Sequence, residues 1–207
     1  MPTLQLTYFD GPGRAEPIRV ALFIAGLPFE DRRIKFPEFV ALKQQGAFPL
    51  GSVPVLAVDG FPMTQTGAML RYVARLGGTD LYPTDPMQAF IVDSAIDTFN
   101  DTLSHALLPS LFERDQAKKL EMRAAFAAGP MTTVYRYAEG LLGRSEGPFL
   151  TGAALSIGDL VLAQSVLQIQ SGTLDGLTSA MLEPYPRMRR LAEAYVAEPR
   201  VAAYRQR

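Results

Sequence analysis

The N-terminal part of the chain alternates between strand-like and helix-like patterns of apolar positions. Leu4, Leu6 and Tyr8 occupy every second position, which predicts a short strand with these side chains on one face. Residues 14–25 repeat apolar positions with a helical period, and residues 29–34 predict a second strand. Because a helix-length crossover joins the two strands, we expect them to be parallel with a right-handed connection.

A hairpin and a helix are predicted next. Residues 53–58 and 61–63 predict two strands joined by a tight turn at Asp59 and Gly60. A short helical or irregular stretch at 37–45 comes before them, and residues 66–76 predict a helix after them. The predicted order is β-α-β-α-β-β-α, which describes a compact sheet with helices on its faces.

The pattern changes after residue 78. Residues 79–86 carry two prolines and several polar residues, which is typical of a linker, and no strand pattern follows. Helical patterns cover residues 87–112, 118–142 (with a break at Gly129 and Pro130), 156–172 and 186–197. Ser156 and Asp159 form a capping box, which satisfies the free N–H groups at a helix start. We predict an α/β domain at 1–78, a linker at 79–86 and an all-helical domain at 87–207.

Composition narrows the classes of function. Twenty Lys and Arg residues balance 21 Asp and Glu residues to a net charge of -1, which argues against nucleic acid as the main partner. No stretch has the apolar length of a membrane span and the N-terminus lacks a signal-peptide pattern, so we expect no membrane contact and a cytoplasmic location. With no cysteine and one histidine, His105, we expect no metal site and no cysteine nucleophile.

Three features of the first domain are candidates for a binding or catalytic site, and each also has an ordinary structural interpretation. Tyr8 at a strand end and Arg14 at a helix start would lie at the same edge of the sheet. The residues alone favour an ordinary trans Pro54 at a strand start, whereas a cis bond would turn the backbone of Val53 outward. Thr66 opens a helix, where it is either a simple N-cap or part of a site for a carboxylate.

Five segments in order resemble the glutathione transferase family, in its tyrosine-dependent classes and most closely sigma. They are LTYFDGPGRAEPIR at 6–19, GSVPVLAVDG at 51–60, TQTGAMLRYVA at 64–74, DSAIDTFND at 93–101 and TGAALSIGDLVLA at 151–163. The resemblance covers nearly the whole chain. It implies a thioredoxin-like first domain without redox cysteines, an all-helical second domain and a cytosolic homodimer. The implied ligands are glutathione as cosubstrate and a hydrophobic electrophile.

The resemblance implies roles for residues at the sulfur end of glutathione. Tyr8 matches the tyrosine whose hydroxyl donates to the glutathione sulfur, and Arg14 matches the arginine that supports it. Val53 followed by a cis Pro54 resembles the backbone clamp on the cysteinyl part, a short β-augmentation.

At the other parts of glutathione, the resemblance implies further contacts. Gln65 and Thr66 match the pair that holds the γ-glutamyl carboxylate. Asp101 matches an acidic residue that reaches across a dimer interface to the γ-glutamyl amine, and Lys43 matches a lysine that binds the glycyl carboxylate.

Two positions depart from the family pattern. Phe39 stands where the family usually has a tryptophan that donates an indole N–H to the glycyl carboxylate, and phenylalanine has no donor. Ser52 stands where a second lysine is common. We therefore predict weaker glutathione binding than in a typical sigma enzyme, with the sulfur end intact.

The predicted activity is conjugation of the glutathione thiolate to hydrophobic electrophiles. Two alternatives stay open: a glutathione-dependent isomerase of sigma type, and a non-catalytic glutathione- or ligand-binding protein of the same fold. The candidate residues of an electrophile pocket are Phe9, Pro12, Gly13, Leu103, Leu107 and Leu108. For the three leucines, ordinary packing is an equally good interpretation.

Overall fold

The computed structural model describes the backbone of residues 1–207 and every side chain except those at positions 103 and 104. The chain forms two compact units, Met1–Thr79 together with Tyr204–Arg207, and Asp80–Ala203. The predicted domain bounds remain a prediction. The units differ from the predicted bounds in two places, because residues 80–86 of the expected linker group with the helical unit and the last four residues group with the first.

The first unit contains a four-stranded sheet in the order β2-β1-β3-β4. Its elements are β1 (Leu4–Phe9), a 3₁₀ turn (Gly13–Ala15), α1 (Glu16–Ile24), β2 (Glu30–Ile34), α2 (Phe36–Gln44), β3 (Val55–Val58), β4 (Phe61–Met63) and α3 (Thr66–Leu76). The pairing of β1 with β2 is parallel, and the two other pairings are antiparallel. The predicted β-α-β-α-β-β-α order is therefore confirmed.

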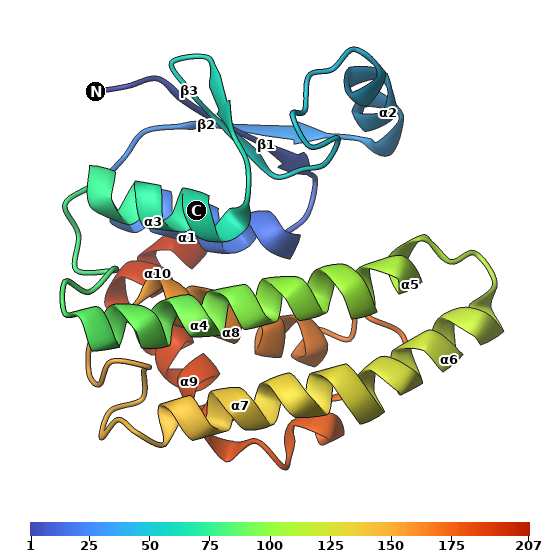
Figure 1. Ribbon diagram of the computed structural model, residues 1–207, viewed down its shortest axis with the longest axis vertical. Helices are drawn as coiled ribbons and strands as arrows, with labels where there is room; N and C mark the ends of the chain where they lie inside the picture. Colours follow the sequence, from blue (N-terminus) through green and yellow to red (C-terminus); the bar gives the residue numbers. More distant parts are fainter. The chain divides into compact units, whose positions relative to one another are not determined.

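Apolar side chains fix how the sheet and its helices pack. Leu4 and Leu6 of β1 are buried, as the alternation predicts. Helices α1 and α3 lie side by side on one face of the sheet (Figure 1) and contact each other. Gly77, just after α3, has to be glycine because a Cβ there would lie 2.5 Å from the Cβ of Ala25.

Local turn chemistry explains most element boundaries in this unit. Asp59 and Gly60 both have positive φ angles, 49° and 82°, which matches the predicted two-residue hairpin turn. The predicted helix at 14–25 instead begins as the 3₁₀ turn, and α1 proper starts at Glu16 with Pro17 in its first turn. Proline suits this position because the first helical N–H groups have no partner within the helix.

The stretch at 37–45, predicted as helical or irregular, forms the regular helix α2.

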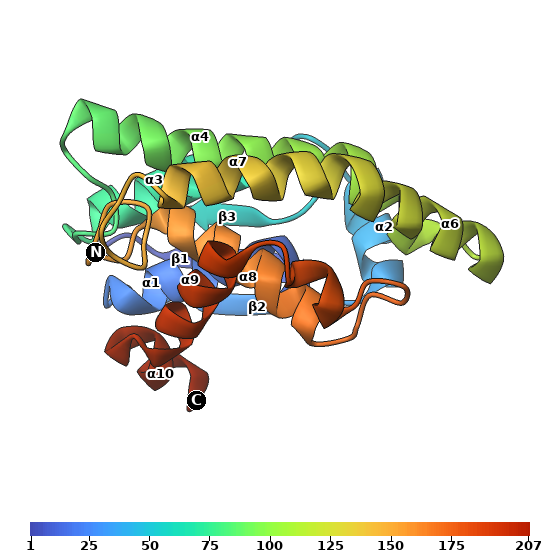
Figure 2. The ribbon, with the colours of Figure 1, turned by 90° about the horizontal axis from the view of Figure 1, so that it is seen from below.

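The second unit is helical. It contains α4 (Pro86–Thr102), a π turn (Leu103–Leu107), α5 (Leu108–Phe112), α6 (Gln116–Phe126), a second π turn (Ala127–Met131), α7 (Thr132–Leu142), α8 (Ile157–Gln170), a 3₁₀ turn (Ser179–Leu182) and α9 (Pro186–Ala197). Helix α10 (Pro199–Arg205) begins in this unit, and its last two residues group with the first unit. Helices α4 and α7 lie side by side in both views (Figures 1 and 2). From 80 to 203, the described backbone has one isolated bridge, Phe149 to Gly152, and no strand.

Two predicted helical segments of this unit contain π turns, and the predicted linker packs against the helical unit. The first π turn divides the segment predicted as continuous at 87–112. The second lies at the break predicted at Gly129 and Pro130, which is confirmed, and Pro130 cannot donate an N–H there. Within the expected linker, Leu81 is fully buried, and its carbonyl accepts a hydrogen bond from the N–H of Ile157 at 2.8 Å. This connection is therefore part of the helical unit.

The predicted capping box at the start of α8 is confirmed and is fully buried. The Asp159 carboxylate accepts from the N–H groups of Leu150, at 2.9 Å, and Ser156, at 2.8 Å, and from the Ser156 hydroxyl at 2.6 Å. Burial raises the pKa of the Asp159 carboxyl to about 6, although these hydrogen bonds favour the charged form. Because the folded state holds this proton more tightly than the unfolded chain does, this group makes stability fall as pH rises from about 4 to about 6.

Replacing Asp159 with asparagine is expected to destabilise the fold by about 1–3 kcal/mol at neutral pH. An amide has one acceptor oxygen, so at least one buried N–H loses its partner. Urea unfolding measures the effect, and the pH dependence between about pH 4 and 6 should become flatter. The matched control is Asp115→Asn at the exposed N-cap of α6, where Asp115 accepts from the Lys118 N–H and asparagine caps equally well. Equal losses for both variants would contradict this account.

Candidate active site

Tyr8 stands at the end of β1, and a short loop returns over its hydroxyl group. The Tyr8 oxygen accepts a hydrogen bond from the backbone N–H of Arg14 at 3.3 Å. Gly13 lies so close that a side-chain carbon built on it would be 2.6 Å from the same oxygen, and its φ angle is +42°. Because the oxygen already accepts from a backbone donor, the phenol hydrogen is available to donate to a bound group.

Arg14 links the first helix to the loop before β3. Its guanidinium donates from Nη2 to the carbonyl of Val53 at 2.9 Å, across 39 positions of sequence. The Val53–Pro54 peptide bond is cis, as the resemblance implies, and the trans form that composition favours is wrong. Strand β3 consequently begins at Val55, two residues later than predicted. The structure thus brings Tyr8, Arg14 and Val53 together.

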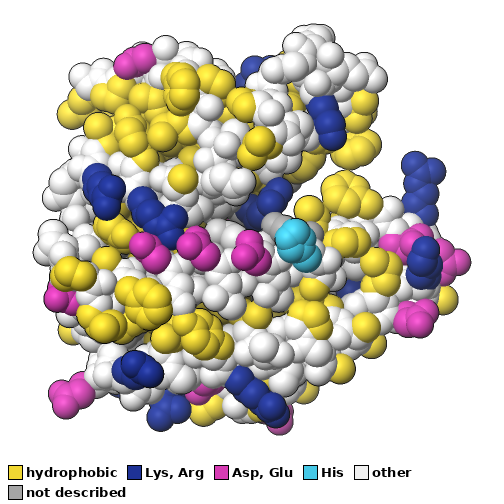
Figure 3. All heavy atoms as spheres, viewed as in Figure 1, with side chains coloured by type: hydrophobic (Ala, Val, Ile, Leu, Met, Phe, Trp, Pro, Cys, Tyr) yellow, Lys and Arg dark blue, Asp and Glu magenta, His cyan; other side chains and the backbone are white. Residues whose placement is uncertain are grey.

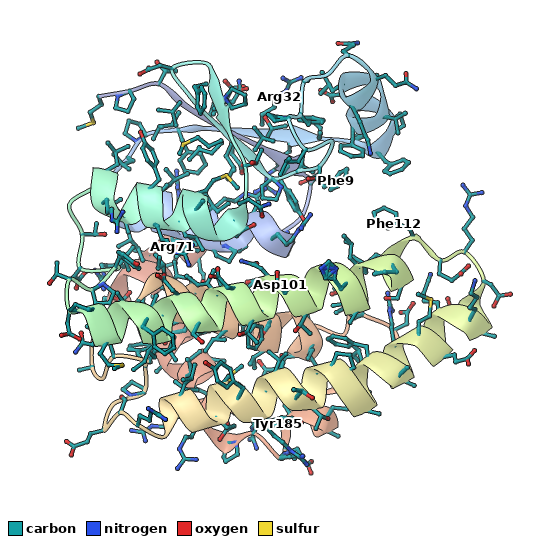
Figure 4. The ribbon with its side chains drawn as sticks, in the orientation of Figure 1. Phe9, Arg32, Arg71, Asp101, Phe112 and Tyr185 are labelled. Carbon is teal, nitrogen blue, oxygen red and sulfur yellow. The ribbon has the colours of Figure 1, made fainter. Side chains whose placement is uncertain are left out.

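Aromatic packing holds this corner of the sheet. Tyr8, Phe9 and Phe39 pack against a buried cluster that includes Phe48. The rings of Phe39 and Phe48 are stacked with centroids 5.6 Å apart, and Phe9 meets Phe39 edge to face at 5.3 Å. Phe9 lies at the carboxyl end of β1 (Figure 4). Such contacts restrict the rotation of the Tyr8 ring, which meets Phe9 edge to face.

The start of α3 differs from the expected N-cap. Gln65, not Thr66, occupies the N-cap position, and no side chain caps the helix there. Gln65 has a φ angle of +70°, an uncommon conformation for a residue with a side chain. Thr66 is the first helical residue and is 8% exposed. The interpretation of Thr66 as a simple N-cap is therefore wrong, and the first N–H groups of α3 have no side-chain cap.

Residues expected at the glycine end of the ligand lie on and after α2. Lys43 is exposed, and its Nζ lies 5.9 Å from the centroid of the Phe39 ring. A Cβ built on Gly51 would lie 3.0 Å from Lys43 Cε, so this glycine allows the lysine to pass close to the chain. Ser52 is exposed and Phe39 is half-buried. Lys43 is thus the cation that the structure places beside Phe39.

The remaining predicted residues belong to the helical unit. Asp101 is an exposed residue of α4 (Figure 4). Leu107 is buried and lines an enclosed apolar cavity with Phe99 and Tyr135, which fits the packing interpretation, and Leu108 is half-buried. The side chain of Leu103 lies outside the described residues. The electrophile pocket therefore stays a prediction, including for Phe9, Pro12 and Gly13.

Arg19 was not expected at the site. It is only 1% exposed, and its guanidinium Cζ lies 6.0 Å from the centroid of the Tyr8 ring. Two features of the sequence could have identified Arg19. It is the last residue of the segment from Leu6 to Arg19 that resembles the family, and it follows Glu16 by three residues, a spacing at which opposite charges meet on a helix.

Neither a metal nor a membrane span is suggested by the described residues. No three of their histidine, aspartate or glutamate side chains are grouped so that they would hold a metal ion. None of their helices combines the length and apolar character needed to cross a bilayer.

Family models match both parts of the chain. A model described as "Glutathione S-transferase, N-terminal domain" matches residues 4–75. Another, described as "Glutathione S-transferase, C-terminal domain", matches residues 100–207.

Individual proteins agree with these matches. Glutathione S-transferase 1 of Ascaris suum is 33% identical over 83% of this chain and 82% of its own length. The human hematopoietic prostaglandin D synthase is 31% identical over 98% of this chain and 94% of its own. A solved structure of prostaglandin synthase D of Nilaparvata lugens superimposes with a TM-score of 0.81 and 28% identity, covering 100% of this chain and 98% of that one.

Proposed function

The chain belongs to the glutathione S-transferase family, and from this premise we propose that it conjugates the glutathione thiolate to hydrophobic electrophilic small molecules. In this proposal, the Tyr8 hydroxyl donates a hydrogen bond to the glutathione sulfur. One observation carries it: the Tyr8 oxygen accepts from the Arg14 backbone N–H at 3.3 Å, which leaves the phenol hydrogen to donate elsewhere.

The hydrogen bond matters because free thiols are weakly ionised at neutral pH. A thiol has a pKa near 8.5, and only the thiolate is a strong nucleophile. A donor aimed at sulfur favours the charged form. Lowering the thiol pKa by about two units needs about 2.7 kcal/mol, which a charge-assisted hydrogen bond with a nearby positive charge can supply.

The proposed reaction is a nucleophilic substitution. The thiol proton of glutathione leaves to solvent, and the sulfur lone pair forms a carbon–sulfur bond to the electrophile. With a chloronitrobenzene acceptor, chloride departs with the bonding electron pair of the carbon–chlorine bond. Tyr8 keeps its proton throughout, because it acts as a donor to the sulfur and not as a general acid.

Contacts along the first unit support a position for the rest of glutathione. We propose that the γ-glutamyl carboxylate binds at Gln65 and Thr66, where α3 begins without a side-chain cap. The cysteinyl part would pair with the backbone of Val53, whose carbonyl has a second lone pair besides the one that Arg14 uses. Lys43 would bind the glycyl carboxylate.

We propose that the active form is a homodimer in which Asp101 reaches the γ-glutamyl amine of the partner subunit's glutathione. Figure 3 shows a row of acidic side chains on the face that it draws. Along α4, Asp93, Asp97 and Asp101 recur at a spacing of four residues. A monomeric mass in sedimentation at working concentration, with full activity, would exclude this arrangement.

Conjugation is tested by assaying the protein with glutathione and a chloronitrobenzene, with product identified by mass. A non-catalytic binding protein would bind glutathione and form no conjugate above the uncatalysed rate. The relatives named prostaglandin D synthase favour one second candidate, an isomerase that uses the same thiolate and regenerates glutathione. Product analysis with an endoperoxide substrate separates the two, because isomerisation leaves glutathione unconsumed.

Glutathione binding is expected to be weak because the glycine end lacks two donors. Ser52→Lys should tighten binding by about 3- to 10-fold, since it adds one charge-assisted contact worth about 1 kcal/mol. Calorimetric titration measures this change, and Ser52→Met is the control because it adds similar bulk without charge. The prediction is wrong if the lysine and methionine variants bind alike, or if the unmodified protein binds as tightly as a sigma enzyme that has both donors.

A further inference from the structure

Arg19 of α1 is a buried arginine outside the proposed ligand contacts. Charged residues are rarely buried unless they are paired, and this one is held by four acceptors. Its Nε donates to Asp31 Oδ1 at 3.0 Å. Its Nη1 donates to the carbonyls of Gly11 at 2.8 Å and Pro12 at 3.3 Å, and to Glu16 Oε2 at 3.1 Å. The guanidinium therefore ties the loop after β1 to the first turn of α1 and to β2.

This loop is the one that covers the Tyr8 hydroxyl. The two carbonyls that Arg19 binds come directly before Gly13, where an added Cβ would lie 2.6 Å from the Tyr8 oxygen, and before Arg14, whose N–H donates to that oxygen. Arg33 of β2 also contacts this loop. Its Nη1 donates to Asp10 Oδ1 at 3.0 Å, and its Nε donates to Oδ2 of Asp31, the β2 residue that also binds Arg19, at 3.0 Å. A shift of the loop would therefore move the donor that orients the phenol.

Arg19 also places charge beside the Tyr8 ring. Its Cζ is 6.0 Å from the ring centroid, the distance at which a cation is attracted by an aromatic ring. Its Nη2 is buried and has no hydrogen-bond partner among the described residues. The same guanidinium therefore contacts the Tyr8 ring as well as the loop that lies over its hydroxyl.

The end of the chain completes this network. Tyr204 donates its hydroxyl to Glu16 Oε1 at 3.0 Å, across 188 positions of sequence, while Oε2 of the same carboxylate accepts from Arg19. The Tyr204 ring meets Phe23 edge to face at 5.6 Å, and the Arg207 guanidinium lies 5.0 Å from the Phe23 ring centroid. These contacts explain why Tyr204–Arg207 group with the first unit.

We propose that Glu16 and Arg19, capped by the Tyr204 hydroxyl, form a positioning network that holds the Gly11–Gly13 loop and so aims the Tyr8 hydroxyl at the bound sulfur. This inference rests on the proposed function of Tyr8. Arg19 acts through Tyr8 and touches no ligand. The last turn of the chain thereby contributes to thiol activation.

The test measures the pH profile of kcat/KM for conjugation, the KM for glutathione and Tm in a set of variants. Tyr204→Phe and Glu16→Gln should raise the apparent pKa of the bound thiol and lower kcat/KM about 3-fold below that pKa, because each weakens one hydrogen bond to a charged group. Arg19→Lys should lower kcat/KM about 10-fold or more, since an ammonium cannot reproduce the planar fork that binds these acceptors. KM for glutathione should stay within about 2-fold.

Tyr82→Phe is the matched control, because Tyr82 also donates to a carboxylate, Asp93 Oδ2 at 2.8 Å, within the helical unit. It should leave the pH profile unchanged. In a Tyr8→Phe background, Tyr204→Phe should cause no further change in the profile, because both act through the same hydroxyl.

The inference is overturned if Tyr204→Phe and Glu16→Gln lower only Tm and leave the pH profile where Tyr82→Phe leaves it. It is also overturned if Tyr204→Phe has its full effect without the Tyr8 hydroxyl. Failure of the proposed function gives a different result, in which Tyr8→Phe itself leaves the profile unchanged.

Discussion

Replacing Tyr8 with phenylalanine is expected to lower kcat/KM for conjugation by about 25-fold at pH 7, and by about 100-fold at pH values well below the pKa of the bound thiol. The substitution keeps the ring and its packing against Phe9 and Phe39, and removes only the hydroxyl that accepts from the Arg14 N–H. Without the donor, the thiol pKa should return by about two units towards that of free glutathione, and the thiolate fraction below that pKa should fall in proportion. Steady-state kinetics with a chloronitrobenzene measures the change.

Glutathione affinity should change little in Tyr8→Phe, because the proposed contacts to its carboxylates and backbone remain. The Tyr82→Phe variant controls for the loss of a hydroxyl elsewhere and should keep full activity. A loss that lies entirely in KM for glutathione would mean that Tyr8 only holds the ligand, and an unchanged kcat/KM would mean that it has no part in the reaction.

Gly13→Ala is expected to lower kcat by about 10-fold or more while Tm falls only modestly. The new methyl group would lie 2.6 Å from the Tyr8 oxygen and 2.8 Å from its Cε1, so either the phenol or the loop has to move. The positive φ angle of Gly13 adds about 1 kcal/mol of backbone strain for an alanine. A displaced hydroxyl loses its aim at the sulfur, and rate depends steeply on such placement.

Gly11→Ala provides the comparison two residues earlier in the same loop. A Cβ on Gly11 would meet nothing within 4 Å, so this variant should keep its activity. Equal activity of the two variants would contradict the proposed packing of the loop against Tyr8. Loss of activity in Gly11→Ala alone would place the sensitive position elsewhere in the loop.

Short-range signals account for what the sequence predicts well. The alternation in β1, the Asp59 and Gly60 turn and the helix at 66–76 depend on neighbouring residues, and all are found in the structure. The capping box of Ser156 and Asp159 is also local, since it spans a single helical turn. Periodicity cannot show a π turn, so residues 87–112 were predicted as one continuous helix, whereas Gly129 and Pro130 gave a local signal for the break in the segment at 118–142.

Features that depend on distant parts of the chain were harder to predict. The cis bond before Pro54 and the positive φ of Gln65 follow from surroundings that composition does not show. The family resemblance supplied the first of these, and nothing in the sequence supplied the second. Arg19 was missed as a site residue because its partners include Asp31 on β2 and two loop carbonyls. The contact of Tyr204 with Glu16 joins opposite ends of the chain and has no local signature.

The state of the sulfur in bound glutathione tests the central claim most directly. Thiolate absorbs in the ultraviolet where the thiol does not, so a pH titration of the complex gives the pKa of the bound thiol. We expect a pKa about two units below that of free glutathione in the unmodified protein, and one close to the free value in Tyr8→Phe. Identical titration curves for the two proteins would contradict the role assigned to Tyr8.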